Sequence, residues 1–135
     1  MNVNVSTSKK SGSGSGGSGT LSGCFSIACC TIKWQLSGAN YEIAIVQVFL
    51  NNEGIGAFQF GPNLQNWSVP PSQVGTCQLN SCLIQGQTAT PGGQIGSLLV
   101  QSFSLDEAGV TYTIQSEILE SWMNNGTVLQ NNSNC

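Results

Sequence analysis

The sequence contains no histidine and no arginine, and its only cations are Lys9, Lys10 and Lys33. Charged residues make up 7% of the 135 residues and the formal net charge is -3, whereas an average soluble protein is about a quarter charged. Binding to nucleic acid or to an anionic membrane needs several clustered cations. The composition therefore argues against both partners, and solubility must come from uncharged polar side chains.

The lack of histidine also removes the commonest general base. The acids are spread over the chain: Glu42, Glu53, Asp106, Glu107, Glu117 and Glu120. Glu117 and Glu120 could pair as the two carboxylates of a glycosidase do. Asp106 and Glu107 could bind calcium, but the regular oxygen-donor spacing of a calcium loop is missing. We therefore expect a non-enzymatic protein with no cofactor and no resident metal.

No hydrophobic run is long enough to cross a membrane as a helix. The longest, YEIAIVQVFL at residues 41–50, is interrupted by Glu42 and Gln47 and has about half the length of a span. The first residues also lack the apolar core of a secretory signal. The cysteine content, however, indicates disulfides and an oxidising environment. We therefore expect an extracellular location, or one on a cell or particle surface, reached without a classical signal peptide.

The first 23 residues are expected to form a flexible arm, and residues 24–135 a single domain. Residues 11–19, SGSGSGGSG, carry no side chain that could bury apolar area, which is typical of a flexible tether. An engineered linker or a disordered tail is the alternative interpretation. The segment VNVSTS at residues 3–8 alternates with the period of a strand and could add to the sheet edge of a neighbour.

The remainder of the chain is predicted to be all-β. TIKWQL at residues 31–36 alternates between apolar and polar residues, and residues 41–50 are apolar on both faces, as in a central strand. NNEG at residues 51–54 favours a hairpin turn because Asn and Gly tolerate positive φ. About eight strands at regular spacing predict an antiparallel β-sandwich or a jelly-roll-like domain.

Two segments are harder to assign. Residues 61–75 hold three of the four prolines and no run of strand length, so we expect the longest loop of the domain there. SEILESW at residues 116–122 fits a strand but also a helical turn, because its apolar residues could share one helix face.

Three of the cysteines fall in the seven residues CFSIACC at 24–30. The full set, which we predict to form disulfides, is Cys24, Cys29, Cys30, Cys77, Cys82 and Cys135. A zinc cage is disfavoured because two cysteine pairs are separated by four residues rather than two, and the spacing of a plant-type iron–sulfur site is also absent.

The simplest pairing joins the 24–30 segment to the segment at residues 77–82. Cys135 then remains on a terminal tail, where it either cross-links copies of the protein or forms a third internal bond.

Aromatic residues supply the candidate ligand site. Trp67 is surrounded by Asn63, Gln65 and Asn66, and Trp122 precedes another turn. An exposed indole beside amides suits a sugar ring and its hydroxyls. The alternative is that both indoles pack over the ends of the sandwich.

These observations favour a self-assembling structural subunit of an extracellular fibre, coat or surface layer, with copies of itself as partners and disulfides within and between subunits. The competing hypothesis is a carbohydrate-binding or toxin-like recognition module that binds glycans through the Trp67 loop. Low charge favours the first because it weakens repulsion between copies.

Overall fold

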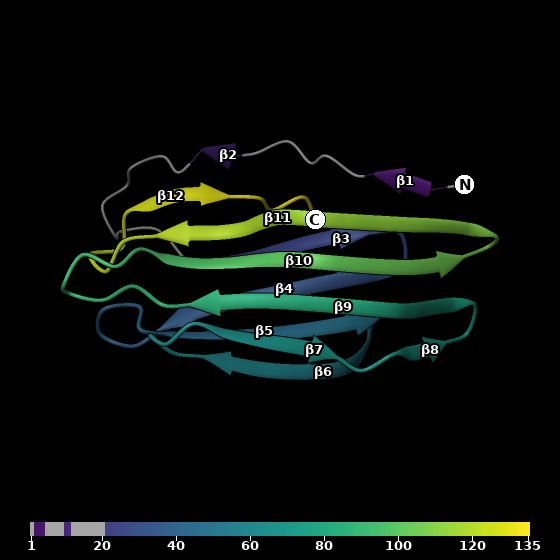
Figure 1. The fold of residues 1–135 in the computed structure, drawn as a ribbon, viewed down its shortest axis with the longest axis horizontal. Helices are drawn as coiled ribbons and strands as arrows, with labels where there is room; N and C mark the ends of the chain where they lie inside the picture. The colour runs from purple at the N-terminus through teal and green to yellow at the C-terminus, as the bar shows by residue number, and fades with distance from the viewer. Residues whose placement is uncertain (1, 5–9, 12–20) are drawn as a thin grey trace.

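The computed structural model describes residues 2–4, 10–11 and 21–135, and for the first two ranges it describes the backbone only. Within these residues the secondary structure consists of strands and turns without a helix. The strands form two sheets that pack face to face, with the larger sheet in front of the smaller in Figure 1. The prediction of an all-β sandwich is confirmed.

The smaller sheet is an antiparallel meander of four consecutive strands in the order β3-β4-β5-β6. Their bounds are β3 (Ser22–Ile27), β4 (Cys30–Ser37), β5 (Ile43–Leu50) and β6 (Glu53–Phe60). The turn between β5 and β6 is the predicted one, since Asn51 and Asn52 both have positive φ. The tight turn between β3 and β4 was not predicted, and there Ala28 has a positive φ of 52°.

The larger sheet has the order β2-β12-β11-β10-β9-β7, with β8 also paired to β9 and β1 to β11. From residue 65 onward, the strands of this sheet are, in chain order, β7 (Gln65–Val69), β8 (Ser72–Val74), β9 (Cys77–Gln87), β10 (Gly96–Glu107), β11 (Val110–Trp122) and β12 (Val128–Asn131). Their pairings with one another are antiparallel.

Two short N-terminal strands lie along the opposite long side from β6 (Figure 1). The strand β1 (Asn2–Asn4) pairs in parallel with β11, and β2 (Lys10–Ser11) pairs antiparallel with β12. The predicted flexibility of the arm concerns residues 1, 5–9 and 12–20, which lie outside the described residues. Leu21 is buried and β3 begins at Ser22.

Two segment predictions need correction. Residues 61–75 contain β7 and β8 rather than one long loop, because their backbones pair with the long strand β9. Pro70 and Pro71 separate these two strands, where a missing backbone N–H does not interrupt a ladder. Residues 116–122 continue β11 as a strand, so the helical alternative is wrong.

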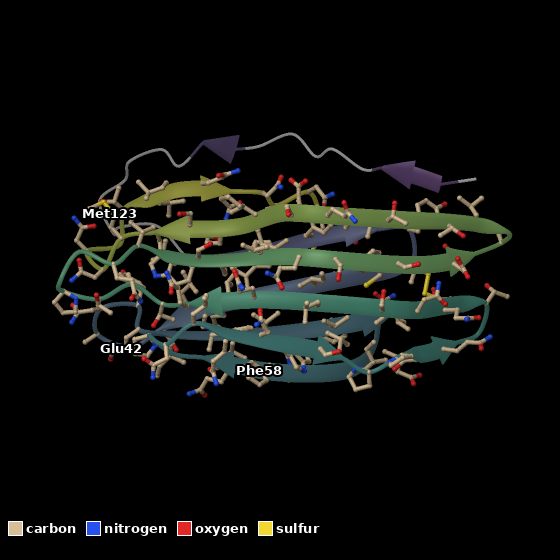
Figure 2. The ribbon with its side chains drawn as sticks, in the orientation of Figure 1. Glu42, Phe58 and Met123 are labelled. Carbon is tan, nitrogen blue, oxygen red and sulfur yellow. A yellow bond between two sulfur atoms is a disulfide. The ribbon has the colours of Figure 1, made fainter. Side chains whose placement is uncertain are left out.

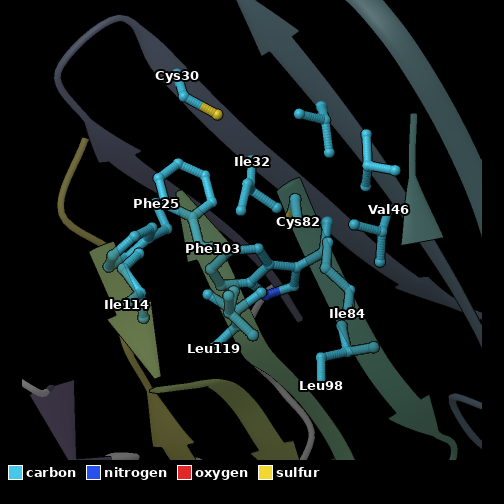
Figure 3. Close-up of a cluster of buried hydrophobic side chains, with 14 of the residues drawn as sticks. Phe25, Cys30, Ile32, Val46, Cys82, Ile84, Leu98, Phe103, Ile114 and Leu119 are labelled. Carbon is cyan, nitrogen blue, oxygen red and sulfur yellow. The ribbon is translucent and has the colours of Figure 1, made fainter. Parts of the chain in front are cut away.

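The hydrophobic core fills the space between the two sheets, as Figure 3 shows for Ile32 and Val46 of one sheet and Ile84, Leu98 and Leu119 of the other. The alternation along β5 determines which residues enter it. The inward side chains of β5 are fully buried, namely Ala44, Val46, Val48 and Leu50. The outward Ile45 is 40% exposed, so β5 is a central strand of its sheet that buries one face.

Close packing around the core depends on glycine at position 96, which pairs with Trp122 on the neighbouring strand of the same sheet. A methyl group on Gly96 would collide with the indole of Trp122, which is fully buried. We expect Gly96→Ala to lower the free energy of unfolding by about 1–3 kcal/mol, the usual cost of overpacking. Gly61→Ala is the matched control, because nothing lies within 4 Å of the added atom. Urea denaturation of both variants measures the difference, and equal stabilities would contradict this account of the packing.

Candidate functional site

Two disulfides join distant parts of the domain. Cys24 bonds to Cys135, and Cys29 bonds to Cys77. The second bond is one that the spacing predicted, since it joins the 24–30 and 77–82 segments. The first corrects the hypothesis of an intermolecular bond through Cys135, because that residue is held inside its own subunit.

The unpredicted turn explains how the clustered cysteines find separate partners. Ala28 and Cys29 form the tight connection between β3 and β4, with Ile27 paired to Cys30. Cys24 therefore lies on β3 and Cys30 on β4, rather than along one extended strand. Cys29 also accepts a hydrogen bond at its carbonyl from the backbone N–H of Asn51, at 2.9 Å.

Cys30 and Cys82 are free and buried, which corrects the prediction that they form disulfides. Their side chains belong to the core between the sheets (Figure 3). Burial raises the pKa of each thiol to about 12, and for Cys30 the neighbouring Cys82 adds to the effect. The thiolate is the reactive form, so these two residues act as small hydrophobic groups in the folded protein.

The C-terminal tail crosses from the larger sheet to the edge strand β3 of the smaller one. The backbone N–H of Asn134 donates to the carbonyl of Cys24 at 2.9 Å. The Asn134 side chain accepts from the N–H of Ser26 and donates to its carbonyl, at 2.6 and 2.9 Å. Ser133 accepts a further bond from the N–H of Cys24. The tail thus pairs the open edge of β3, and the Cys24–Cys135 bond fixes it there.

A buried carboxyl, Glu120 on β11, lies beneath this tail and joins the two sheets. Its Oε1 accepts hydrogen bonds from Trp34 Nε1 on β4, at 2.8 Å, and from Asn131 Nδ2, at 2.7 Å. Its Oε2 is buried without a hydrogen-bond partner. Burial raises the pKa of Glu120 to about 7, because the two hydrogen bonds compensate only part of the lost hydration. The sequence marked Glu120 only as a possible partner of Glu117, because its spacing carries no signal of burial.

The opposite side of the sandwich is open. Within the described residues β6 pairs only with β5, so one side of its backbone has no ladder partner. Residues 54–60, GIGAFQF, contain neither charge nor proline. Natural edge strands commonly carry charged residues or proline, which block unwanted pairing. The absence of charge and proline from residues 54–60 could be read from the sequence. The position of this strand at the edge of a sheet could not.

The predicted ligand residues of the Trp67 loop lie beside this same open edge. Trp67 is half-buried on β7 and stacks on Phe58 of β6, with ring centres 5.6 Å apart. Asn63, Gln65 and Asn66 are exposed, and Asn66 accepts a hydrogen bond from Gln85 at 3.1 Å. The structure thus places Trp67 at the β6 rim, where Figure 2 labels Phe58, and Phe58 occupies one face of the indole, whereas Asn66 bonds to Gln85 of β9.

Trp122 does not belong to that group. It is fully buried, and its Nε1 donates to the carbonyl of Tyr41 at 3.1 Å. This corrects the candidate ligand role for Trp122, because no ligand can reach a side chain enclosed by the sandwich. Trp122 therefore fits the alternative interpretation, in which the indole packs at the end of the sandwich.

The described residues contain no group of three or more metal-ligating side chains. A search of the same residues for a helix of membrane-spanning length and hydropathy finds none. The two disulfides are compatible with an oxidising environment. The open side therefore presents the unpaired backbone donors and acceptors of β6 beside the stacked rings of Phe58 and Trp67.

Glu120 predicts how stability depends on pH. The unfolded carboxyl ionises near its ordinary pKa of 4.5, whereas the folded one keeps its proton until about pH 7. The contribution of Glu120 to the free energy of unfolding is therefore fully present below pH 4.5. It falls by about 3 kcal/mol as the pH rises to 7. In Glu120→Gln this part of the pH dependence should vanish. Denaturation at a series of pH values measures it, with the exposed Glu53→Gln as control. An unchanged slope in Glu120→Gln would refute the assignment.

The disulfide assignment predicts a definite pattern of thiol labelling. The folded protein should take up no maleimide, the unfolded protein without reductant two, and the reduced unfolded protein six. The double variant Cys24→Ser/Cys135→Ser should remain monomeric on a non-reducing gel and lose about 4–5 kcal/mol, because the bond closes a loop of 111 residues. Intact-mass spectrometry counts the labels. A wild-type dimer that reductant dissolves would contradict the internal pairing.

No family model matches this chain, and no similar curated protein or solved structure was found in comparisons with known proteins. A functional assignment therefore has to come from the chemistry of the molecule itself. Its two notable surfaces are the edge of β3, which is covered by the C-terminal tail, and the edge of β6, which is open.

Proposed function

We propose that the protein is a non-enzymatic structural subunit that assembles with copies of itself into an extracellular fibre, coat or surface layer. The observation that carries this proposal is the open edge of β6, whose residues 54–60 carry no charge. An edge strand of this kind presents unpaired backbone groups that another strand can complete. Assembly through backbone pairing needs no catalytic group and no cofactor.

The electrostatics of the chain support association. Within residues 21–135 the only cation is Lys33, whose Nζ lies 5.2 Å from the centre of the Phe49 ring. The net charge of -3 is small for 135 residues. Mutual repulsion between copies is therefore weak, and backbone hydrogen bonds with modest apolar contact suffice to hold them together.

The internal disulfides support a rigid subunit rather than covalent links between subunits. Both bonds close within one chain, and the remaining thiols are buried. Disulfides of this kind form and persist in an oxidising exterior. Its contacts with neighbours must then be non-covalent, which replaces the predicted intermolecular disulfides.

A carbohydrate-binding module remains the second candidate, and one observation favours it. A depression of about 470 Å³ lies on the outer face of the larger sheet. It is lined by hydroxyls and an amide from Ser81, Ser102, Thr113 and Gln115, and by Phe103 and Ile114, whose side chains are buried. Such a lining suits a neutral sugar. Discrete monomers that bind a glycan array would favour this candidate over assembly.

The assembly proposal predicts particles larger than one chain. We expect the purified wild-type protein to form dimers or regular polymers as its concentration rises, because each copy carries the open edge. Light scattering coupled to size-exclusion chromatography measures the mass, and electron microscopy shows the regularity. The same masses with and without reductant are expected, since no bond between chains is involved. A monomer at every concentration would overturn the proposal.

A further inference from the structure

We infer that the partner of β6 is β6 of a second copy, joined antiparallel so that the two four-stranded sheets become one sheet of eight strands. The inference rests on the proposed function and names the surface and the occupant that start the assembly. The interacting segment is the regular part of the strand, residues 56–60.

The backbone of β6 has the required unpaired groups. In an antiparallel ladder, alternate residues turn their N–H and C=O toward the partner and the others turn them away. β6 is paired along its length with β5, apart from an irregularity near Ile55. Between Gly56 and Phe60 the register to β5 is continuous, so the groups turned away form a regular row on the open side.

The strand is complementary to itself. Residues 54–60 are uncharged, so a second copy meets no like charge along the paired stretch. Antiparallel pairing centred on Phe58 places Ala57 of each copy opposite Gln59 of the other. The single charge of β6, Glu53, then lies ten positions from its counterpart, at a separation of about 33 Å. Repulsion across that distance is screened by ordinary salt.

The other edges are less suited to this role. The C-terminal tail covers β3 through Asn134 and the Cys24–Cys135 bond. β1 and β2 occupy β11 and β12. β7 has five residues and is followed by Pro70 and Pro71, which cannot donate backbone hydrogen bonds. β6, with eight residues, is the longest strand edge that the described residues leave without a partner.

Contacts between aromatic rings fix the position of the Phe58 side chain on β6. Phe58 contacts Phe60 edge-to-face and stacks on Trp67. A methyl group on Gly56 would lie 3.0 Å from the Trp67 indole, so glycine there allows the ring to lie close to the strand. Leu64, just after β6, is 59% exposed. Leu64 can supply apolar contact beside the backbone pairing, while the packed rings fix the position of Phe58.

A pair of lysine variants separates edge pairing from any other contact. Ala57 is exposed on β6, and its cross-strand neighbour Gln47 is exposed on β5, on the same outer face. We expect Ala57→Lys to weaken association at least tenfold, because a lysine on an edge strand opposes pairing. Gln47→Lys should associate as the wild type does. Light scattering measures association, and urea denaturation verifies that both variants are folded.

Cross-linking tests the register. In a mixture of Ala57→Cys and Gln59→Cys, a short bismaleimide should join the two variants more efficiently than it joins either variant to itself. Glu53→Cys is the control and should cross-link poorly, and the buried native thiols do not compete.

The outcomes separate the inference from the proposed function. Assembly that survives Ala57→Lys, equal loss in Gln47→Lys, or preferred cross-linking of Glu53→Cys would overturn the β6 inference while leaving self-assembly intact. A wild-type protein that stays monomeric would overturn both. If a lysine variant fails to fold, the cross-linking pattern alone decides between pairing and its absence.

Discussion

The contact between the C-terminal tail and β3 decides which surfaces of this protein are closed and which are open. A sandwich of two sheets leaves edge strands on both long sides, and each edge exposes backbone donors and acceptors. Here the tail leaves the larger sheet after β12, pairs with β3 of the smaller sheet and is tied by the Cys24–Cys135 bond. The edge of β3 is thereby covered, whereas β6 has no ladder partner on its outer side within the described residues.

Burial of polar groups accompanies this closure. Glu120 and Asn132 are fully buried near the crossing, in a chain that has very few charged residues. Glu120 connects Trp34 of one sheet with Asn131 of the other, which fixes how the sheets meet at this end. A buried carboxyl is tolerated because it holds its proton into the neutral range, so the cost of burying a charge is avoided.

The open side differs in chemistry from the sealed one. It combines an edge strand whose residues 54–60 carry neither charge nor proline with an aromatic pair, Phe58 and Trp67. Two internal disulfides tie the smaller sheet to the larger sheet and to the C-terminal tail. These features are the basis of the association proposed for β6.

Local patterns determined several of the strands and the turn at residues 51–54. The alternation of residues 31–36 and the Asn-rich turn at 51–54 depend only on neighbours in the chain, so the sequence was sufficient to predict them. The strand character of residues 65–69 depends on pairing with β9, and the positive φ of Ala28 depends on the hairpin around it. The fates of Trp122, Cys135 and Glu120 were likewise decided by tertiary contacts. Burial and partnership arise between residues far apart in the chain, and local periodicity carries no information about which distant strand will cover them.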